Sequence, residues 1–326
     1  MTGRWVVVGN ESECQSGSMS VPRLGLARPP AAALAGGNNA ERRRVFDEAR
    51  PEIDPRNSLN ALTAKEWLSE SVSVWNQKGL GAGHAEAAIE KLHPAPYSYT
   101  DVARIIKMLT KPGQTVLDPF VGVGSTLKAA ALEGRLGIGF ELYPDFAKLA
   151  RLRLKQEVPK EILTASPQRV LQGDSRSLGK KLEKDSIDLI VTSPPYWSIL
   201  NKKSDHKQKQ TREAHGLVTT YGDDDRDLGN IDDYDEFITV LGQTLADAGA
   251  ALKHRGYLVL IVGDFRHKTR FYPFHADIAR DLEGRGFTLQ AMNVLYQRHK
   301  RVFPYGYPFA YVPNVHHQNI VIMRKL

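Results

Sequence analysis

The fold is decided by the stretch Val116-Leu117-Asp118-Pro119-Phe120-Val121-Gly122-Val123-Gly124-Ser125-Thr126. An apolar run leads into a glycine-rich turn and then into residues that begin a helix, which predicts a strand, a tight turn and a helix. Gly122 and Gly124 let the backbone pass close to a ligand, because neither carries a Cβ. Ligands of open parallel sheets bind at the carboxyl ends of the strands, where this turn is expected. An ordinary β–α turn is the alternative interpretation.

On both sides of this turn, strand patterns alternate with helical patterns. Strands are expected at 114–118, 136–142, 170–172, 187–192, 257–263, 288–297 and 319–323. Helices are expected at 63–74, 100–109, 125–132, 143–155, 234–252 and 274–285. The first helix is predicted to be amphipathic, with Trp67 and Val74 on its apolar face. This alternation predicts an α/β fold in which helices cover both faces of a parallel sheet.

The chain divides into an N-terminal extension and one domain. Residues 1–56 are rich in Gly, Ser, Ala and Pro, which predicts a flexible segment. Residues 57–326 carry the strand and helix patterns of a single domain. Within it, 198–230 has many charges and no strong period, so we expect an inserted loop that is either functional or mobile.

Composition narrows the partners and the compartment. The chain of 326 residues has 44 Lys and Arg against 37 Asp and Glu, which gives a formal net charge of +7. This balance favours a polyanionic partner such as nucleic acid, with solubility as the alternative. Cys14 is the only cysteine, which excludes an intrachain disulfide and a cysteine-rich zinc site. No apolar run approaches the roughly 20 residues of a membrane helix, so we expect a cytoplasmic protein.

Carboxylates close the next two strands. Glu141 ends the strand after the glycine turn, about 20 residues later, where a carboxylate accepts hydrogen bonds from ribose hydroxyls. An adenosine-containing ligand is therefore expected. Two features favour S-adenosylmethionine over a dinucleotide. The turn lacks the third glycine of a pyrophosphate-binding loop, and Asp118 is placed to bind an ammonium group. Asp174 follows the third strand and either accepts from an adenine amino group or caps a helix.

The tetrad Ser193-Pro194-Pro195-Tyr196 directly follows the clearest strand of the sequence. Two prolines remove two backbone donors and restrict two φ angles, so the segment is rigid and its carbonyls are unpaired. The Ser193 hydroxyl and the Pro194 carbonyl can accept from both N–H groups of an exocyclic base amine, which localises the nitrogen lone pair for attack on a sulfonium methyl. Tyr196 can stack on a base flipped out of the duplex. A stiff loop is the alternative.

Together, the glycine turn and the tetrad resemble the amino-methyltransferases of DNA, the N4-cytosine and N6-adenine enzymes, over roughly residues 57–326. The resemblance implies a Rossmann-like class I methyltransferase fold, with a seven-stranded mixed sheet and one antiparallel strand near its edge. It assigns catalysis to the tetrad and S-adenosyl-L-methionine binding to the residues around the turn. The predicted cofactor-binding residues are His93, Pro94, Asp118, Phe120, Gly122, Gly124, Ser125, Glu141, Leu142, Asp174 and Ser175.

The serine that heads the tetrad is commoner among the N4-cytosine enzymes of this family, so N4 of cytosine is the favoured target and N6 of adenine the first alternative. An RNA-base or protein-glutamine methyltransferase, and a non-catalytic DNA-binding module, remain as further alternatives. Methylation at C5 of cytosine is disfavoured, because it needs a cysteine nucleophile and Cys14 stands alone. A cognate restriction nuclease is a candidate partner.

Two basic segments are candidates for contacts with DNA phosphates. One lies beside the tetrad and the other before the last strand, where aromatic residues follow it. The predicted DNA-binding residues are Lys202, Lys203, Lys207, Lys209, Arg212, Arg298, Lys300 and Arg301. A solvated charged loop and a core edge are the alternatives. No metal site is predicted, since His316 and His317 have no carboxylate or cysteine at ligand spacing.

Overall fold

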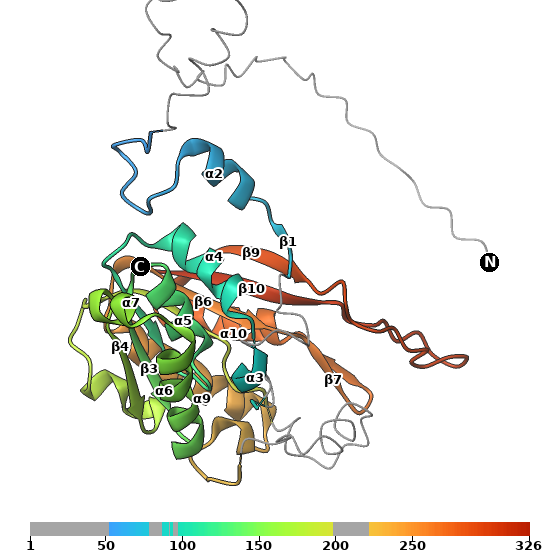
Figure 1. Ribbon diagram of the computed structural model, residues 1–326. Coiled ribbons are helices and arrows are strands. Elements are labelled where there is room, and N and C mark those ends of the chain that lie inside the picture. Colours follow the sequence, from blue (N-terminus) through green and yellow to red (C-terminus); the bar gives the residue numbers. More distant parts are fainter. Residues whose placement is uncertain (1–51, 78–86, 91, 94–96, 198–221) are drawn as a thin grey trace, which may run out of the picture. The chain divides into compact units, whose positions relative to one another are not determined.

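The computed structural model describes residues 52–77, 87–90, 92–93, 97–197 and 222–326, all within the compact unit Pro51–Leu326. Its centre is an eight-stranded sheet of order β1-β9-β10-β6-β5-β2-β3-β4 (Figure 1). The strands are β1 (Val74–Asn76), β2 (Thr115–Asp118), β3 (Leu136–Glu141), β4 (Gln168–Gln172), β5 (Ile187–Thr192), β6 (Leu252–Val262), β9 (Phe287–Tyr296) and β10 (His317–Lys325). Within this sheet, only β10 runs antiparallel to its neighbours. The predicted class I methyltransferase fold is confirmed, with β1 as one strand more than expected.

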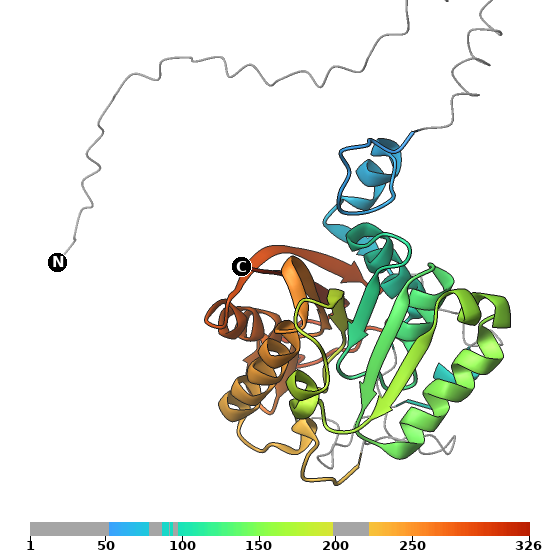
Figure 2. The same cartoon turned by 90° about the vertical axis from the view of Figure 1, so that its left-hand side faces the viewer.

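Helices cover both faces of the sheet (Figure 2). They are α2 (Ala64–Glu70), α3 (Ala87–Glu90), α4 (Tyr99–Leu109), α5 (Ser125–Leu132), α6 (Pro144–Glu157), α7 (Lys160–Ala165), α9 (Tyr234–Gly249) and α10 (Phe274–Glu283), with the 3₁₀ turns η2 (Ser175–Lys180) and η3 (Leu228–Asn230). Alternate residues of β5 enter different cores. Ile190 packs with residues of α9 and α10, whereas Leu189 and Val191 pack with residues of α4 and α5. This two-sided burial explains why three consecutive residues of the strand, Leu189 to Val191, are apolar.

The predicted helix 63–74 is wrong at its C-terminal end. Thr63 and Glu66 form a capping box that begins α2, but the helix ends at Glu70. Val74 instead begins β1, which pairs in parallel with β9, and Trp75 is buried beneath the Arg104 guanidinium. Trp67 is 42% exposed and Val74 is 58% exposed, so the expected apolar face is not buried. Pairing with a strand more than 200 residues away, Val74 with Val294, overrides the local helical period.

The helix expected at 234–252 also ends early, because Leu252 begins β6 and lies opposite Ile187 of β5. Sequence patterns missed the small hairpin of β7 (Phe265–His267) and β8 (Arg270–Tyr272). Its aromatic rings pack with Trp197, which follows the tetrad. Across the described residues, no helix has both the length and the apolarity needed to span a bilayer.

Candidate active site

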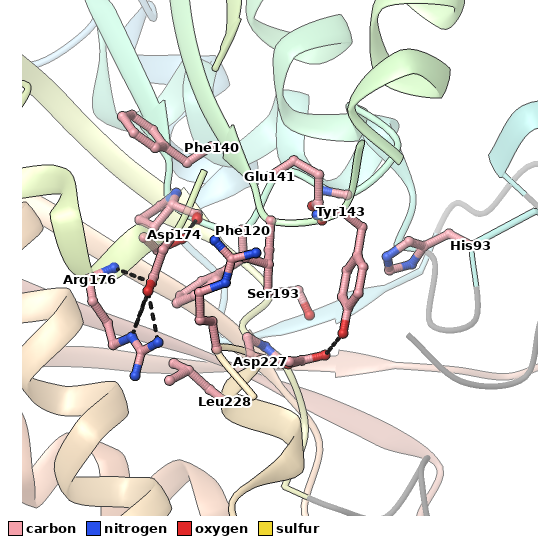
Figure 3. A pocket seen from close by; sticks show the side chains of 16 residues that line it. His93, Phe120, Phe140, Glu141, Tyr143, Asp174, Arg176, Ser193, Asp227 and Leu228 are labelled. Atoms are coloured by element: carbon pink, nitrogen blue, oxygen red, sulfur yellow. Dashed lines mark hydrogen bonds and ion pairs between the residues drawn. The ribbon is translucent and has the colours of Figure 1, made fainter. Parts of the chain in front are cut away.

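A pocket lies where β2, β3, β4 and β5 end (Figure 3). Both sequence motifs reach it, the glycine turn through Phe120 and Gly122, and the tetrad through Ser193 and Pro195. The full lining is His93, Pro119, Phe120, Gly122, Phe140, Glu141, Leu142, Tyr143, Asp174, Ser175, Arg176, Ser193, Pro195, Arg226, Asp227 and Leu228. The turn and the tetrad, about 70 positions apart in sequence, therefore share one cavity.

The glycine turn has the conformation that its residues favour. Gly122 and Gly124 have φ of +52° and +87°, and Gly124 directly precedes α5. A Cβ at Gly122 would lie 2.9 Å from Nε2 of His93. The ring of His93 also contacts Phe146 edge-on, with centroids 5.0 Å apart. Gly122 is thus required both by its backbone angle and by the close approach of His93.

Glu141 closes β3 with both carboxylate oxygens on backbone donors. The N–H groups of Gly122 and Tyr143 each donate to it at 2.9 Å. Burial raises the pKa of Glu141 to about 7 despite these two bonds. Each carboxylate oxygen has a second lone pair and can accept from one more donor at the pocket wall.

Asp118 ends β2, directly before the glycine turn. Its carboxylate is fully buried and accepts from the hydroxyls of Tyr97 at 2.7 Å and Thr126 at 2.5 Å. Its other oxygen accepts from the N–H of Phe120 at 3.0 Å. Burial raises the pKa of Asp118. Asp118 is not among the residues that line the pocket, and these bonds hold the glycine turn in place. Its contact with an ammonium group stays a prediction.

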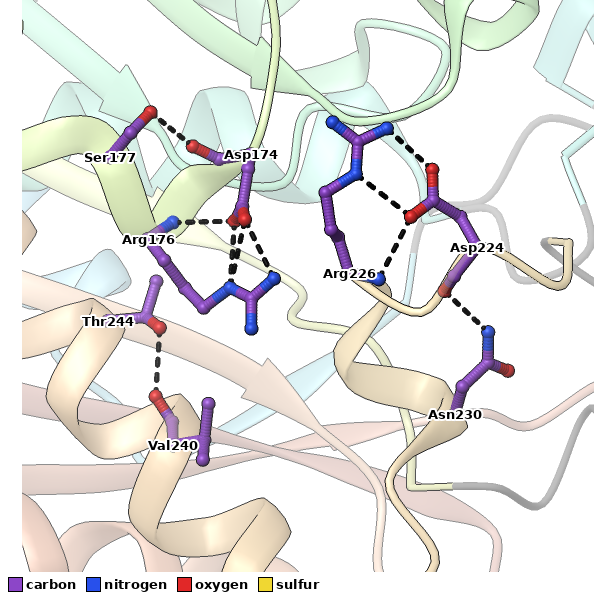
Figure 4. Close-up of polar contacts among 8 residues, drawn as sticks. All are labelled: Asp174, Arg176, Ser177, Asp224, Arg226, Asn230, Val240 and Thr244. Carbon is purple, nitrogen blue, oxygen red and sulfur yellow. Dashed lines mark hydrogen bonds and ion pairs between the residues drawn. The ribbon is translucent and has the colours of Figure 1, made fainter.

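Asp174 and Ser175 reach the pocket after β4. Asp174 caps η2 by accepting from the N–H of Arg176 and also pairs with the Arg176 guanidinium at 2.8 Å (Figure 4). The helix cap, which was one of the two interpretations, is thus present while the residue lines the pocket. The Ser175 hydroxyl donates to the carbonyl of Pro119, which ties this segment to the glycine turn. The Ser125 hydroxyl donates to the carbonyl of Tyr97 at 2.8 Å.

The tetrad is anchored to β6. The Ser193 hydroxyl donates to the carbonyl of Ile261 at 2.9 Å. The phenol oxygen of Tyr196 accepts from the N–H of Gly263 at 3.0 Å, and its ring contacts Phe274 edge-on. Since its single hydrogen is already donated, the Ser193 oxygen has only acceptor capacity left for the pocket. Stacking of Tyr196 on a base stays a prediction.

Sequence reasoning missed seven residues that line the pocket: Pro119, Phe140, Tyr143, Arg176, Arg226, Asp227 and Leu228. The last three stand near the end of the predicted loop. Arg226, Asp227 and Leu228 line the pocket opposite the glycine turn. Arg226 pairs with Asp224 at 2.6 Å and holds the pKa of that carboxyl at about 2. Asp224 and Arg226 have the same Asp-x-Arg spacing as Asp174 and Arg176. This repetition is the sequence feature that could have indicated the second pair. Both pocket arginines are neutralised by aspartates, which leaves the carboxylates of Glu141 and Asp227 to set the charge of the site.

Several predicted residues lie outside the described part of the chain: Pro94, Lys202, Lys203, Lys207, Lys209 and Arg212. Arg298, Lys300 and Arg301 are described and exposed, on the connection between β9 and β10. Among the described residues, no group of three or more His, Cys, Asp and Glu side chains is placed to hold a metal ion.

Comparison with known proteins agrees with this architecture. The family model for N6 and N4 methyltransferases, described as DNA methylase, matches residues 37–152, which include the glycine turn. Several Type II methyltransferases also match stretches of the chain. The segment that carries the glycine turn is therefore similar to the DNA amino-methyltransferases. S-adenosyl-L-methionine is the cofactor that goes with this family.

The matches to individual proteins are short. The Type II methyltransferase M.ScaI of Streptomyces caespitosus is 32% identical over 26% of this chain and 28% of its own length. A tRNA (guanine(10)-N2)-dimethyltransferase of Pyrococcus abyssi is 28% identical over 36% of this chain and 34% of its own. TTHA0409 of Thermus thermophilus, solved with S-adenosyl-L-methionine, is 25% identical with a TM-score of 0.33, covering 47% of this chain and 53% of that one. The chain thus spans about a third of the length of these two curated relatives.

Proposed function

We propose that the chain is a site-specific DNA methyltransferase that transfers a methyl group from S-adenosyl-L-methionine to an exocyclic base amine, N4 of cytosine being the favoured target. One observation carries this proposal: the glycine turn and the tetrad line the same pocket. A methyl donor bound at Gly122 and an amine bound at Ser193 would therefore lie in the same cavity. Such proximity supplies much of the rate enhancement in reactions between two bound molecules. We assign residues 57–326 to this catalytic domain, with 198–230 as an insertion.

The pocket residues fit the cofactor. Phe120, Phe140 and Leu228 offer apolar walls for an adenine ring, and Glu141 has acceptor capacity for ribose hydroxyls. Asp174 stands at the same rim for the adenine amino group. A side chain at Gly122 would meet the ring of His93, so only a glycine fits at this point of the turn. The cofactor supplies a methyl group on a positively charged sulfur, which the surrounding carboxylates favour electrostatically.

Ser193 and Pro194 bind and orient the amine. The Ser193 oxygen has given its hydrogen to the Ile261 carbonyl, so it meets an amine N–H as an acceptor. The carbonyl of Pro194 is the second acceptor, and the following Pro195 keeps that carbonyl from moving. Two accepted N–H bonds draw the lone pair out of the ring conjugation. With the cofactor bound, the C–N bond would form as the C–S bond breaks, the demethylated thioether would leave, and the methylated nitrogen would lose one proton to solvent water.

Two alternatives share this chemistry. N6 of adenine presents the same NH₂ group, so the tetrad accepts it equally, and the serine at its head is what favours cytosine. An RNA base is the second alternative, supported by the similarity to the tRNA dimethyltransferase. For DNA we assign phosphate contacts to Arg298, Lys300 and Arg301, and to the basic residues of 202–212. A cognate restriction nuclease is the partner that we expect.

The test is incubation of the full chain with methyl-labelled cofactor and duplex DNA, RNA or protein, followed by nucleoside mass spectrometry. Label in N4-methylcytosine is the expected result, and label in N6-methyladenine would replace the favoured base with the alternative. Label found only in RNA or in protein would overturn the DNA assignment. A Ser193→Ala variant run in parallel controls for contaminating methyltransferases.

A further inference from the structure

The connection between β9 and β10 is an exposed arm rich in aromatic residues. We call residues 298–316 the aromatic arm; it projects from the sheet as the red extension in Figure 1. Tyr305 is 50% exposed, Tyr307 81%, Phe309 95% and Tyr311 89%. Aromatic side chains are normally the most strongly buried by area, so four exposed on one short segment indicate a binding surface.

The arm has internal bonds that give its tip a definite shape. The Asn314 side chain accepts from the N–H of Phe303 at 2.9 Å and donates to its carbonyl at 2.8 Å. The N–H groups of Phe309 and Ala310 both donate to the carbonyl of Gly306, at 2.8 and 2.7 Å. A tip held in this way loses little conformational entropy when its rings bind.

The charge of the arm identifies the kind of partner. Residues 298–316 contain Arg298, Lys300 and Arg301 and no Asp or Glu. The arm has cations near its root and aromatic rings at its tip, which suits binding to a nucleic acid. The phosphates attract the cations, and the bases stack on the rings. An apolar protein surface would not need the cations.

The root of the arm adjoins the tetrad. The N–H of Gln297 donates to the carbonyl of His316 at 2.7 Å and closes the base of the arm. The Gln318 side chain approaches the Tyr196 hydroxyl at 3.4 Å. Because β10 is antiparallel to β6, its first residues lie at the carboxyl edge of the sheet beside Gly263. The arm therefore starts from the edge of the sheet where the target amine would bind.

We propose that the aromatic arm is a wedge that enters the base stack of duplex DNA and fills the space left by the extruded target base. This inference rests on the proposed function and adds how the duplex is opened. Extruding a base loses its stacking and pairing, and an inserted ring restores part of that stacking. Tyr307, Phe309 and Tyr311 are the residues assigned to insertion, since they are the most exposed aromatic residues of the arm.

The test compares the full-length wild-type chain with Tyr307→Ala/Phe309→Ala/Tyr311→Ala on two duplexes, after sequencing of methylated products has located the target base. One duplex is fully paired and the other has a mismatch opposite the target, which is already easier to extrude. On the paired duplex, we expect kcat/KM of the triple variant to fall at least about tenfold. On the mismatched duplex, the loss should shrink to about threefold or less.

Tyr307→Phe/Tyr311→Phe is the matched control, because it keeps every ring, and it should retain most of the wild-type activity. An equal loss on both duplexes would overturn the wedge and leave a plain binding surface, and so would no loss at all. A variant of unchanged activity but altered oligomeric state would show instead a contact between copies. If the wild type methylates no DNA at all, the proposed function itself is refuted. This result is distinct from the results that overturn only the wedge. An unchanged Tm verifies that the variants fold.

Discussion

The hydroxyl of Tyr143 donates to Oδ2 of Asp227 at 2.8 Å, across 84 positions of the chain. The bond joins the end of β3 to the segment that lines the far side of the pocket. Asp227 is buried, which raises its pKa, and its other oxygen accepts from the N–H of Gly229 at 2.8 Å. The ring of Tyr143 lies so close to Gly222 that a Cβ there would meet it at 2.5 Å. Tyr143 thus positions residues 222–228 against the glycine turn.

Tyr143→Phe should weaken cofactor binding by roughly five- to tenfold. The buried Asp227 carboxylate then loses one of its two donors, which costs about 1–3 kcal/mol, and part of this cost appears in the pocket. Titration calorimetry measures the change. Tyr257→Phe, at the amino half of β6, is the matched control and should bind as the wild type does. Equal affinities for Tyr143→Phe and wild type would show that the bond does not support the pocket.

Cofactor affinity should depend on the charge of Glu141. Its pKa is raised by burial to about 7, so the carboxylate is ionised above that pH and protonated below it. Ribose hydroxyls donate more strongly to the ionised form, and affinity should therefore fall by up to about tenfold per pH unit below pH 7. Titrations between about pH 5.5 and 8.5 test this, with Glu141→Gln expected to bind weakly at every pH. A flat profile for the wild type contradicts the role of Glu141.

Substitutions of Asp118 distinguish two roles of its carboxylate, direct contact with the cofactor and support of the glycine turn. Asp118→Asn keeps the acceptor for the N–H of Phe120 and can still pair with the hydroxyls of Tyr97 and Thr126, so it should bind cofactor within a few-fold of wild type. Asp118→Ala removes the acceptor and should lower the free energy of unfolding by about 1–3 kcal/mol. Denaturant unfolding and calorimetry measure both. If Asn and Ala abolish binding alike without loss of stability, the carboxylate contacts the ligand directly.

Gly122 and His93 should be energetically coupled. Gly122→Ala places a Cβ 2.9 Å from Nε2 of His93, and should weaken cofactor binding at least about tenfold through displacement of that ring and strain at positive φ. In the double variant with His93→Ala, the added methyl meets no ring and only the backbone strain remains. The loss from Gly122→Ala should therefore be smaller in that background. Additive losses in this double-mutant cycle would refute the contact.

Ser193→Ala should lower kcat by roughly ten- to hundredfold, because hydrogen bonds to groups that gain charge are worth about 1.5–3 kcal/mol. Cofactor affinity should stay within a few-fold, as the hydroxyl is directed to Ile261 and the amine. Ser186→Ala, whose exposed hydroxyl also donates to a backbone carbonyl, is the control. Full turnover by Ser193→Ala would remove the serine from the mechanism.

The local sequence pattern was sufficient to predict the central strands and the glycine turn between them. The helix Ser125–Leu132 and the strand Ile187–Thr192 have the predicted bounds, since glycine, proline and a run of apolar residues act on their immediate neighbours. The same reasoning predicted that the glycine turn and the tetrad meet, because the carboxyl ends of parallel strands share one edge.

Only the tertiary structure decided the partners of the polar groups. The sequence by itself determined that Asp118, Glu141 and Asp174 stand at strand ends. Packing decided that Asp118 is buried behind the turn, that Asp227 is bonded to Tyr143, and that a turn and a strand replace the end of the first predicted helix. The physical reason is range. Backbone period and turn chemistry act over a few residues, whereas burial and hydrogen-bond partners depend on distant segments that only the folded sheet brings together.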